Sequence, residues 1–108
     1  MDMKKITAII RYVDLEKVEM RLRDLGIGGF NISKVKGYGE YANFSRTDWK
    51  VSHARLEIFT EQSKVDEIIT AIMETAHSGA AGDGIVAVLP VEKTYRIRTK
   101  SEVTSGDL

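Results

Sequence analysis

Residues 54–89, ARLEIFTEQSKVDEIITAIMETAHSGAAGDGIVAVL, decide the fold of this chain. Across residues 54–59 every second side chain is aliphatic, which is typical of a strand with one buried face. Residues 65–76 carry apolar side chains three and four positions apart, which indicates an amphipathic helix. Ser63 and Asp66 have the spacing of a capping box, with aspartate in place of the usual glutamate. We therefore predict a strand that leads into a helix.

The same stretch ends in a small-residue loop and a second strand. Residues 77–84 are mostly glycine, alanine and serine, and residues 85–89 are almost entirely apolar, which predicts a loop followed by a buried strand. Pro90 should end this strand, because proline has no N–H group to donate to a strand ladder. Residues 95–99 alternate between basic and other side chains and predict one more short strand.

The N-terminal part of the chain has the same order of elements without a residue-level repeat. Residues 6–10 are a compact apolar run and residues 29–36 form a second predicted strand. Asp14 is a candidate N-cap for a helix over residues 15–25. Gly26 and the glycines after it should stop this helix, because glycine accepts the left-handed conformation that ends a helix.

Two strand–helix–strand units of similar length predict an α+β fold, with a ferredoxin-like double βαβ architecture and an antiparallel sheet. Both helices should cover one face of the sheet. We expect the other face to carry isoleucine, valine, alanine and leucine, and further copies of the chain are the simplest cover for it. One domain should span residues 1–108, with a loop at about 37–52 and a flexible tail at about 100–108.

The composition excludes several classes of function. Basic and acidic residues both number 16, so the chain lacks the basic excess of a nucleic-acid-binding protein. Cysteine is absent, which excludes disulfides and thiolate chemistry. The N-terminal apolar run is too short for a signal peptide or a membrane span, so we expect a cytoplasmic protein. His53 and His77 have no neighbour at metal-ligand spacing, and no catalytic arrangement is recognisable, so we predict neither a metal site nor an enzyme.

Two features suit an anion. Small residues in loop 77–84 let backbone N–H groups approach a phosphate closely, although a flexible turn is the simpler explanation of the glycine content alone. Arg96 and Arg98 should point to one face of a strand, and guanidinium groups suit phosphate oxygens. The alternative for this pair is a solvated edge strand. Together the two features favour a phosphate site more than either does alone.

Residues 37–52 form a longer connection than is usual within a domain, and such loops are usually functional or disordered. Tyr41, Phe44 and Trp49 in this segment are candidate anchors for a partner protein, because aromatic side chains dominate interface hot spots. Packing on their own domain is the alternative, and we favour partner binding.

Several segments of the chain resemble the PII signal-transduction proteins. They are KKITAIIR at 4–11, VKGYG at 35–39, GDG at 82–84, LPVE at 89–92 and RIRT at 96–99. The similarity covers nearly the whole chain except the middle loop. It implies a ferredoxin-like homotrimer that binds ATP or ADP in clefts between subunits. It also implies a non-enzymatic regulator that controls a transporter, an enzyme or another regulator through a protruding loop.

The resemblance further implies which residues surround the nucleotide. The backbone at Gly37, Tyr38 and Gly39 would line the cleft. Asn31, Glu57 and Phe59 would lie around the adenine and ribose. Gly82, Asp83 and Gly84 would cradle phosphate, while Arg96 and Arg98 would reach across from the adjacent subunit.

The chain departs from the family pattern where phosphate and magnesium would bind. Ile85 stands where the family usually has lysine, and Glu40 and Tyr41 stand where it usually has arginine and glutamine. Ala80 and Ala81 replace the usual basic residue of the small-residue loop. Since each charged contact in a partly buried site is typically worth about 1.5–3 kcal/mol, we predict that ADP or AMP binds better than ATP.

The middle loop is shorter than usual and lacks the family's modifiable tyrosine, so we expect neither uridylylation nor the usual contacts with nitrogen enzymes. Bicarbonate is a candidate input signal, bound near Arg96, Arg98 or the base of the loop. The regulated transporter or enzyme is not identifiable from the sequence. The alternatives are a nitrogen-type regulator that responds to ATP and 2-oxoglutarate, a small ferredoxin-like hydrolase, and a structural trimer with a vestigial cleft.

Overall fold

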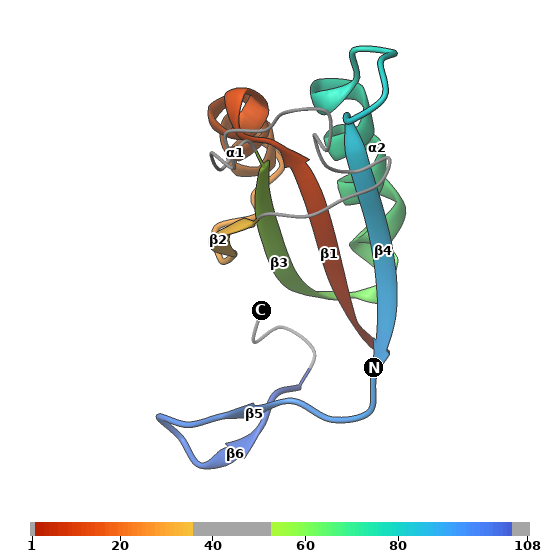
Figure 1. Cartoon of the computed structure of the whole chain (residues 1–108). Helices are drawn as coiled ribbons and strands as arrows, with labels where there is room; N and C mark the ends of the chain where they lie inside the picture. The colour runs from red at the N-terminus through yellow and green to blue at the C-terminus, as the bar shows by residue number, and fades with distance from the viewer. Residues whose placement is uncertain (1, 36–52, 105–108) are drawn as a thin grey trace.

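Figure 1 shows the computed structural model of the chain, which describes residues 2–35 and 53–104. Strands and helices follow one another in the predicted order, and single turns of 3-10 helix at Tyr12–Asp14 and Gln62–Lys64 lead into the two helices. The elements are β1 (Met3–Arg11), α1 (Leu15–Asp24), β2 (Asn31–Val35), β3 (His53–Glu61), α2 (Val65–Ala76), β4 (Gly84–Val91), β5 (Tyr95–Arg96) and β6 (Ser101–Glu102).

The four longer strands form one antiparallel sheet in the order β2-β3-β1-β4. The register places Ile6 of β1 between Ile58 of β3 and Val88 of β4. Each βαβ unit contributes one inner strand and one edge strand, so the two halves interlock. This is the predicted ferredoxin-like arrangement, and the α+β fold class is confirmed.

One face of the sheet is buried under both helices, which lie on the same side of it in Figure 1. Alternate side chains of the inner strands point to this side and meet the apolar stripes of the helices. The centre of the core consists of Ile6, Ile10, Leu56, Ile58, Val18, Leu22, Ile68 and Ile72. Burial of each large aliphatic side chain contributes roughly 1.5–3 kcal/mol, so this cluster is the main source of stability.

The face without helices is more polar than predicted. The edge strand β4 presents Ile85 and Leu89 there, which are 45% and 42% exposed, as expected for an apolar face. The inner strands instead present Lys5 and Glu57, which form an ion pair. The prediction of an aliphatic face is therefore right along β4 and at Ile9 of β1, which pairs with Ile85, and wrong at Lys5 of β1 and Glu57 of β3.

Neither helix begins with the predicted side-chain cap. Asp14 precedes α1, but its carboxylate makes no capping hydrogen bond, because Arg11 and Lys17 engage it instead. Ser63 lies within the 3-10 turn before α2, where Lys64 takes the cap position without a side-chain bond. The two 3-10 turns, rather than capping side chains, connect each inner strand to its helix.

The sequence predicted that Pro90 ends the last strand of the sheet, and this prediction is wrong. β4 continues through Pro90, which lies opposite Lys4, to Val91. The reason is that β4 is an edge strand, where the missing N–H of a proline can face away from the ladder.

β5 and β6 form a separate hairpin that stands away from the sheet beyond the end of β4 (Figure 1). Arg96 pairs with Ser101, so the hairpin includes residues that the sequence assigned to the tail. The strand predicted over residues 95–99 is wrong beyond Arg96, because the chain turns over residues 97–100. Arg98 therefore lies in a turn and does not share a strand face with Arg96.

Candidate functional site

The segment that joins α2 to β4, called loop 77–84 here and including the first residue of β4, depends on glycine conformations that other residues rarely adopt. Gly79, Gly82 and Gly84 have φ angles of +89°, +97° and +120°. At Gly84 the chain passes so close to β1 that a Cβ atom would overlap the carbonyl oxygen of Ile9 and lie 2.9 Å from its carbonyl carbon. Only glycine fits there, so the loop joins the sheet at a fixed point.

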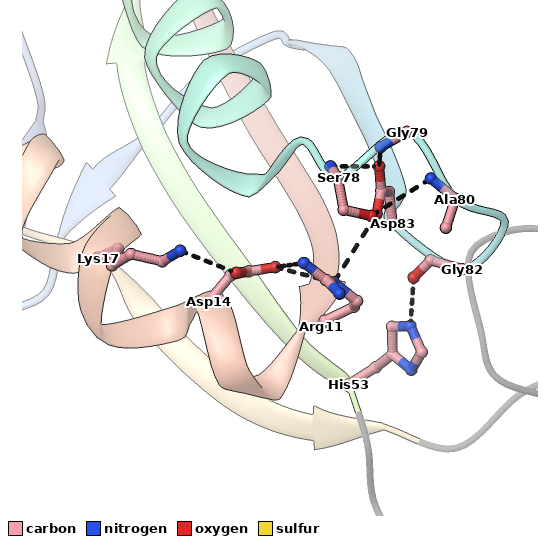
Figure 2. A network of polar contacts seen from close by, with 9 residues as sticks. All are labelled: Arg11, Asp14, Lys17, His53, Ser78, Gly79, Ala80, Gly82 and Asp83. Atoms are coloured by element: carbon pink, nitrogen blue, oxygen red, sulfur yellow. Dashed lines mark hydrogen bonds and ion pairs between the residues drawn. The ribbon is translucent and has the colours of Figure 1, made fainter.

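The carboxylate of Asp83 closes this loop, as Figure 2 shows. It accepts hydrogen bonds from the Ser78 hydroxyl, from the Ser78 N–H at 2.8 Å and from the Gly79 N–H at 2.9 Å. These donors, with the charge of Arg11 nearby, lower the pKa of Asp83 to about 2. Asp83 is therefore ionised and its carboxylate binds donors of its own loop, while its role in a phosphate cradle stays a prediction.

This internal network leaves few loop amides for a ligand. The Ala80 N–H donates to the Ser78 hydroxyl at 3.3 Å, and the Asp83 N–H donates to the Ala80 carbonyl at 3.4 Å. Within the described part of the chain, the N–H groups of Ala81 and Gly82 have no acceptor. An anion at this loop would meet these two amides.

Arg11, the last residue of β1, connects the loop to helix α1. Its guanidinium lies 2.8 Å (Nη2) and 3.0 Å (Nε) from the Asp14 carboxylate, and Nε lies 3.7 Å from the Asp83 carboxylate. Lys17 approaches Asp14 at 3.4 Å, so alternating charges run from α1 to the loop (Figure 2). The Asp14 side chain is only 4% exposed, and its two cations compensate for the loss of water around its charge.

His53, the first residue of β3, contacts the loop at Gly82. It is 2% exposed, and its Nε2 atom lies 2.8 Å from the carbonyl oxygen of Gly82. Because a carbonyl oxygen can only accept, Nε2 carries the hydrogen. From the sequence, His53 is considered only as a possible metal ligand, and this contact is not predicted. No sequence signal could have found it, since nothing local places residue 53 beside residue 82.

The predicted adenine and ribose residues share the helix-free face of the sheet. Asn31 of β2 lies opposite Glu57 of β3, and Phe59 follows two positions further along β3 and is 43% exposed. Lys5 pairs with Glu57, and its Nζ atom lies 5.8 Å from the centre of the Phe59 ring. The hydrogen bond from Lys5, with the charge of Arg55 at 3.6 Å, lowers the pKa of Glu57.

Arg96 and Phe59 both line a cavity of about 290 Å³, together with the glycine-containing turn at residues 26–29. The exposed Arg98 does not line this cavity. The cavity lies where β3 ends, whereas loop 77–84 lies where β3 begins. A single chain therefore holds the predicted phosphate loop and the predicted phosphate arginine at opposite ends of its sheet, as Figure 1 shows.

The other predicted site residues, Gly37, Tyr38, Gly39, Tyr41, Phe44 and Trp49, lie outside the described residues. Among residues 2–35 and 53–104, no three acidic or histidine side chains are grouped so that they could hold a metal ion. No helix in those same ranges has the length and apolar character needed to cross a membrane.

Known proteins match this chain over almost its whole length. The family model described as nitrogen regulatory protein P-II matches residues 3–101. The chain belongs to the P-II family. The P-II protein of Pasteurella multocida is 38% identical over 107 residues, which is 93% of this chain and 96% of that relative. P-II proteins of Azospirillum brasilense and Microchaete diplosiphon are 36% and 35% identical, over 90% and 96% of this chain and 93% and 99% of theirs.

Membership in the P-II family confirms the resemblance seen in the short segments of the sequence. It also confirms that the chain is a signalling protein and not an enzyme, because P-II proteins are regulators. The alternative of a small ferredoxin-like hydrolase is thereby set aside. The double βαβ fold described above is the P-II architecture that the resemblance implied.

Proposed function

We propose that this P-II protein is a homotrimeric regulator that binds ADP or AMP, in preference to ATP, at sites shared between neighbouring copies. The observation that carries the proposal is the separation of the site within one chain. Loop 77–84 contacts the start of β3, whereas Arg96 and Phe59 line a cavity near its end. In a head-to-tail ring, a ligand between two copies can contact the loop of one copy and Arg96 of the next.

The helix-free face supports an assembly of copies. Phe59, Ile85 and Leu89 on this face are 43%, 45% and 42% exposed, and apolar patches of this kind mark interaction surfaces. Lys5 and Glu57 lie between them and are already paired. A neighbouring copy can therefore cover this face without leaving an isolated buried charge.

The chemistry of loop 77–84 supports a nucleotide with few phosphates. The amides of Ala81 and Gly82 remain for a phosphate, while the ionised carboxylate of Asp83 lies next to them. Ile85, directly after the loop, adds no positive charge. Each additional phosphate brings negative charge without a new donor, so ADP and AMP should bind more tightly than ATP.

Bicarbonate is the proposed second signal, and residues 37–52 are the proposed output. Arg96 and Arg98 supply the positive charge that a small anion beside a short nucleotide needs. Tyr41, Phe44 and Trp49 would anchor the regulated transporter or enzyme. The protein would then report the adenylate state and inorganic carbon to that partner.

Calorimetric titration with AMP, ADP and magnesium-ATP, each with and without bicarbonate or 2-oxoglutarate, tests the ligand preference. We expect ADP or AMP to bind most tightly and bicarbonate at tens of millimolar to strengthen that binding. Arg96→Ala should weaken ADP binding at least about tenfold, as expected for a lost charged contact. Arg23→Ala is the matched control, because Arg23 is an exposed arginine on α1 whose ion pair among the described residues is with Glu19 of the same helix.

Mixed assemblies test whether the site is shared. Arg96→Ala removes the arginine, and Asp83→Ala removes the carboxylate that closes the loop, so each variant alone should bind ADP weakly. The two chains are unfolded, mixed in equal amounts and refolded together. If each site takes its loop and its arginine from different copies, about one quarter of the sites regain both groups. If both groups act within one chain, no site is restored and the shared arrangement is refuted.

The names of the relatives favour one rival, a nitrogen-type regulator that responds to ATP and 2-oxoglutarate. The same titrations decide between the two. Tight magnesium-ATP binding that 2-oxoglutarate strengthens, with no effect of bicarbonate, would establish the rival and refute the preference proposed here.

A further inference from the structure

Two side chains that face each other across the inner strands both hold loop 77–84. Arg11 of β1 and His53 of β3 are partners in the strand register. Arg11 reaches Asp83 at 3.7 Å, and His53 reaches the Gly82 carbonyl at 2.8 Å. Arg11 is the last residue of β1 and His53 is the first residue of β3, so the loop is attached to both inner strands at the same end of the sheet.

The hydrogen bond from His53 fixes the orientation of the peptide unit between Gly82 and Asp83. Gly82 has a φ angle of +97°, and without a side chain its conformation depends on what its backbone groups bind. The Gly82 carbonyl is held by the buried imidazole, and the N–H of the same peptide unit, on Asp83, donates to the Ala80 carbonyl. Both ends of this peptide unit are thus fixed.

We propose that His53 is a positioning residue for the phosphates of the bound nucleotide, supported by Arg11 and acting through the loop. By binding the Gly82 carbonyl, His53 holds the loop in the conformation in which the N–H groups of Ala81 and Gly82 have no acceptor among the described residues. The imidazole does not touch the ligand. This inference rests on the proposed function, because it assumes that phosphate binds at this loop.

The test compares a ligand that has phosphates with one that lacks them. His53→Leu introduces an apolar side chain of similar bulk and removes the donor, so ADP should bind about tenfold more weakly, as expected for one lost hydrogen bond at a partly buried position. Adenosine has no phosphate, and its affinity should change less than about twofold. His53→Gln offers an amide N–H to the Gly82 carbonyl and should restore most of the ADP affinity.

A stability-matched control separates positioning from general weakening of the fold. Ile58→Val removes one buried methyl group from the same strand, far from the loop, and should lower the melting temperature without changing the ratio of ADP to adenosine affinity. Equal losses for ADP and adenosine in His53→Leu, or no rescue by His53→Gln, would overturn the proposal. Wild-type protein that binds no adenine nucleotide would refute the proposed function itself, which is a separate result.

A spectroscopic measurement covers the case in which His53→Leu does not fold. In wild-type protein, the imidazole nitrogens should show the tautomer with hydrogen on Nε2, in slow exchange with water. That Nε2–H resonance should shift when ADP is added and stay in place when adenosine is added. A hydrogen on Nδ1 alone, or equal shifts with both ligands, would contradict the proposal.

Discussion

Replacing Gly84 with alanine should destabilise the protein more than the same change at Gly82. Both glycines have positive φ angles, so backbone strain costs about 1–3 kcal/mol at either position. The surroundings differ. At Gly82 no atom lies within 4 Å of the new Cβ, whereas at Gly84 the Cβ overlaps the Ile9 carbonyl oxygen and lies 3.2 Å from the Ile10 Cα atom. Relief of this overlap requires β4 to shift away from β1, which adds about 1–3 kcal/mol.

The measurement is the free energy of unfolding by urea, at one protein concentration because the stability of an assembly depends on concentration. A difference of about 2 kcal/mol between the two variants corresponds to a melting temperature lower by about 10 °C. Gly28→Ala is the control, since no atom lies within 4 Å of its Cβ, and it should change stability by less than about 0.5 kcal/mol. Equal losses at Gly82 and Gly84 would refute the reasoning, because the overlap with Ile9 would then carry no cost.

Other parts of the structure lead to further predictions. The pKa of Asp83 is lowered from 3.8 to about 2, so the contribution of its carboxylate to stability is complete above pH 4 and is lost as the pH falls through 2. The amide resonances of Ser78 and Gly79 should therefore titrate near pH 2. A midpoint near pH 4 would contradict the hydrogen-bond network. Ile85→Lys should raise the affinity for ATP relative to ADP about tenfold in calorimetric titrations, and Ile85→Leu is the control. An unchanged ratio of ATP to ADP affinity would show that this position lies away from the phosphates. Leu56→Ala should lower the free energy of unfolding by about 2–5 kcal/mol, because Leu56 is fully buried. Met20→Ala, on the exposed side of α1, should lower it by less than about 0.5 kcal/mol. Similar losses in the two variants would contradict the assigned core.

The main elements of the fold were predictable because their signals are summed over many residues. In α2, the spacing of Ile68 and Ile72 belongs to a stripe that runs through the whole helix. The ends of elements depend on fewer contacts. Asp14 has the character of a helix cap, but the sequence does not show that Arg11 and Lys17 compete for its carboxylate. Likewise, Pro90 is compatible with a strand only at a sheet edge, and strand order is not a local property.

The candidate site was predictable only in part, for the same reason. The neighbourhood of Asn31 and Glu57 followed from the family resemblance and agrees with the strand register. The direction of the Asp83 carboxylate did not, because a carboxylate among glycines can point either to a ligand or back into its own loop. The contact between His53 and Gly82 joins residues 29 positions apart and exists only once the sheet has formed.

The strand order also determines how long β1 waits for its pairing partners during synthesis. β1 is the first strand along the chain but an inner strand of the sheet, and Met3 pairs with both Glu61 and Val91. At roughly 5–20 residues per second, β4 is synthesised on the order of seconds after β1, so β1 cannot pair with both β3 and β4 until then. During this time the apolar side chains of Ile6 and Ile10 are open to other nascent chains, so a chaperone that protects this protein would act on β1 before β4 emerges from the ribosome.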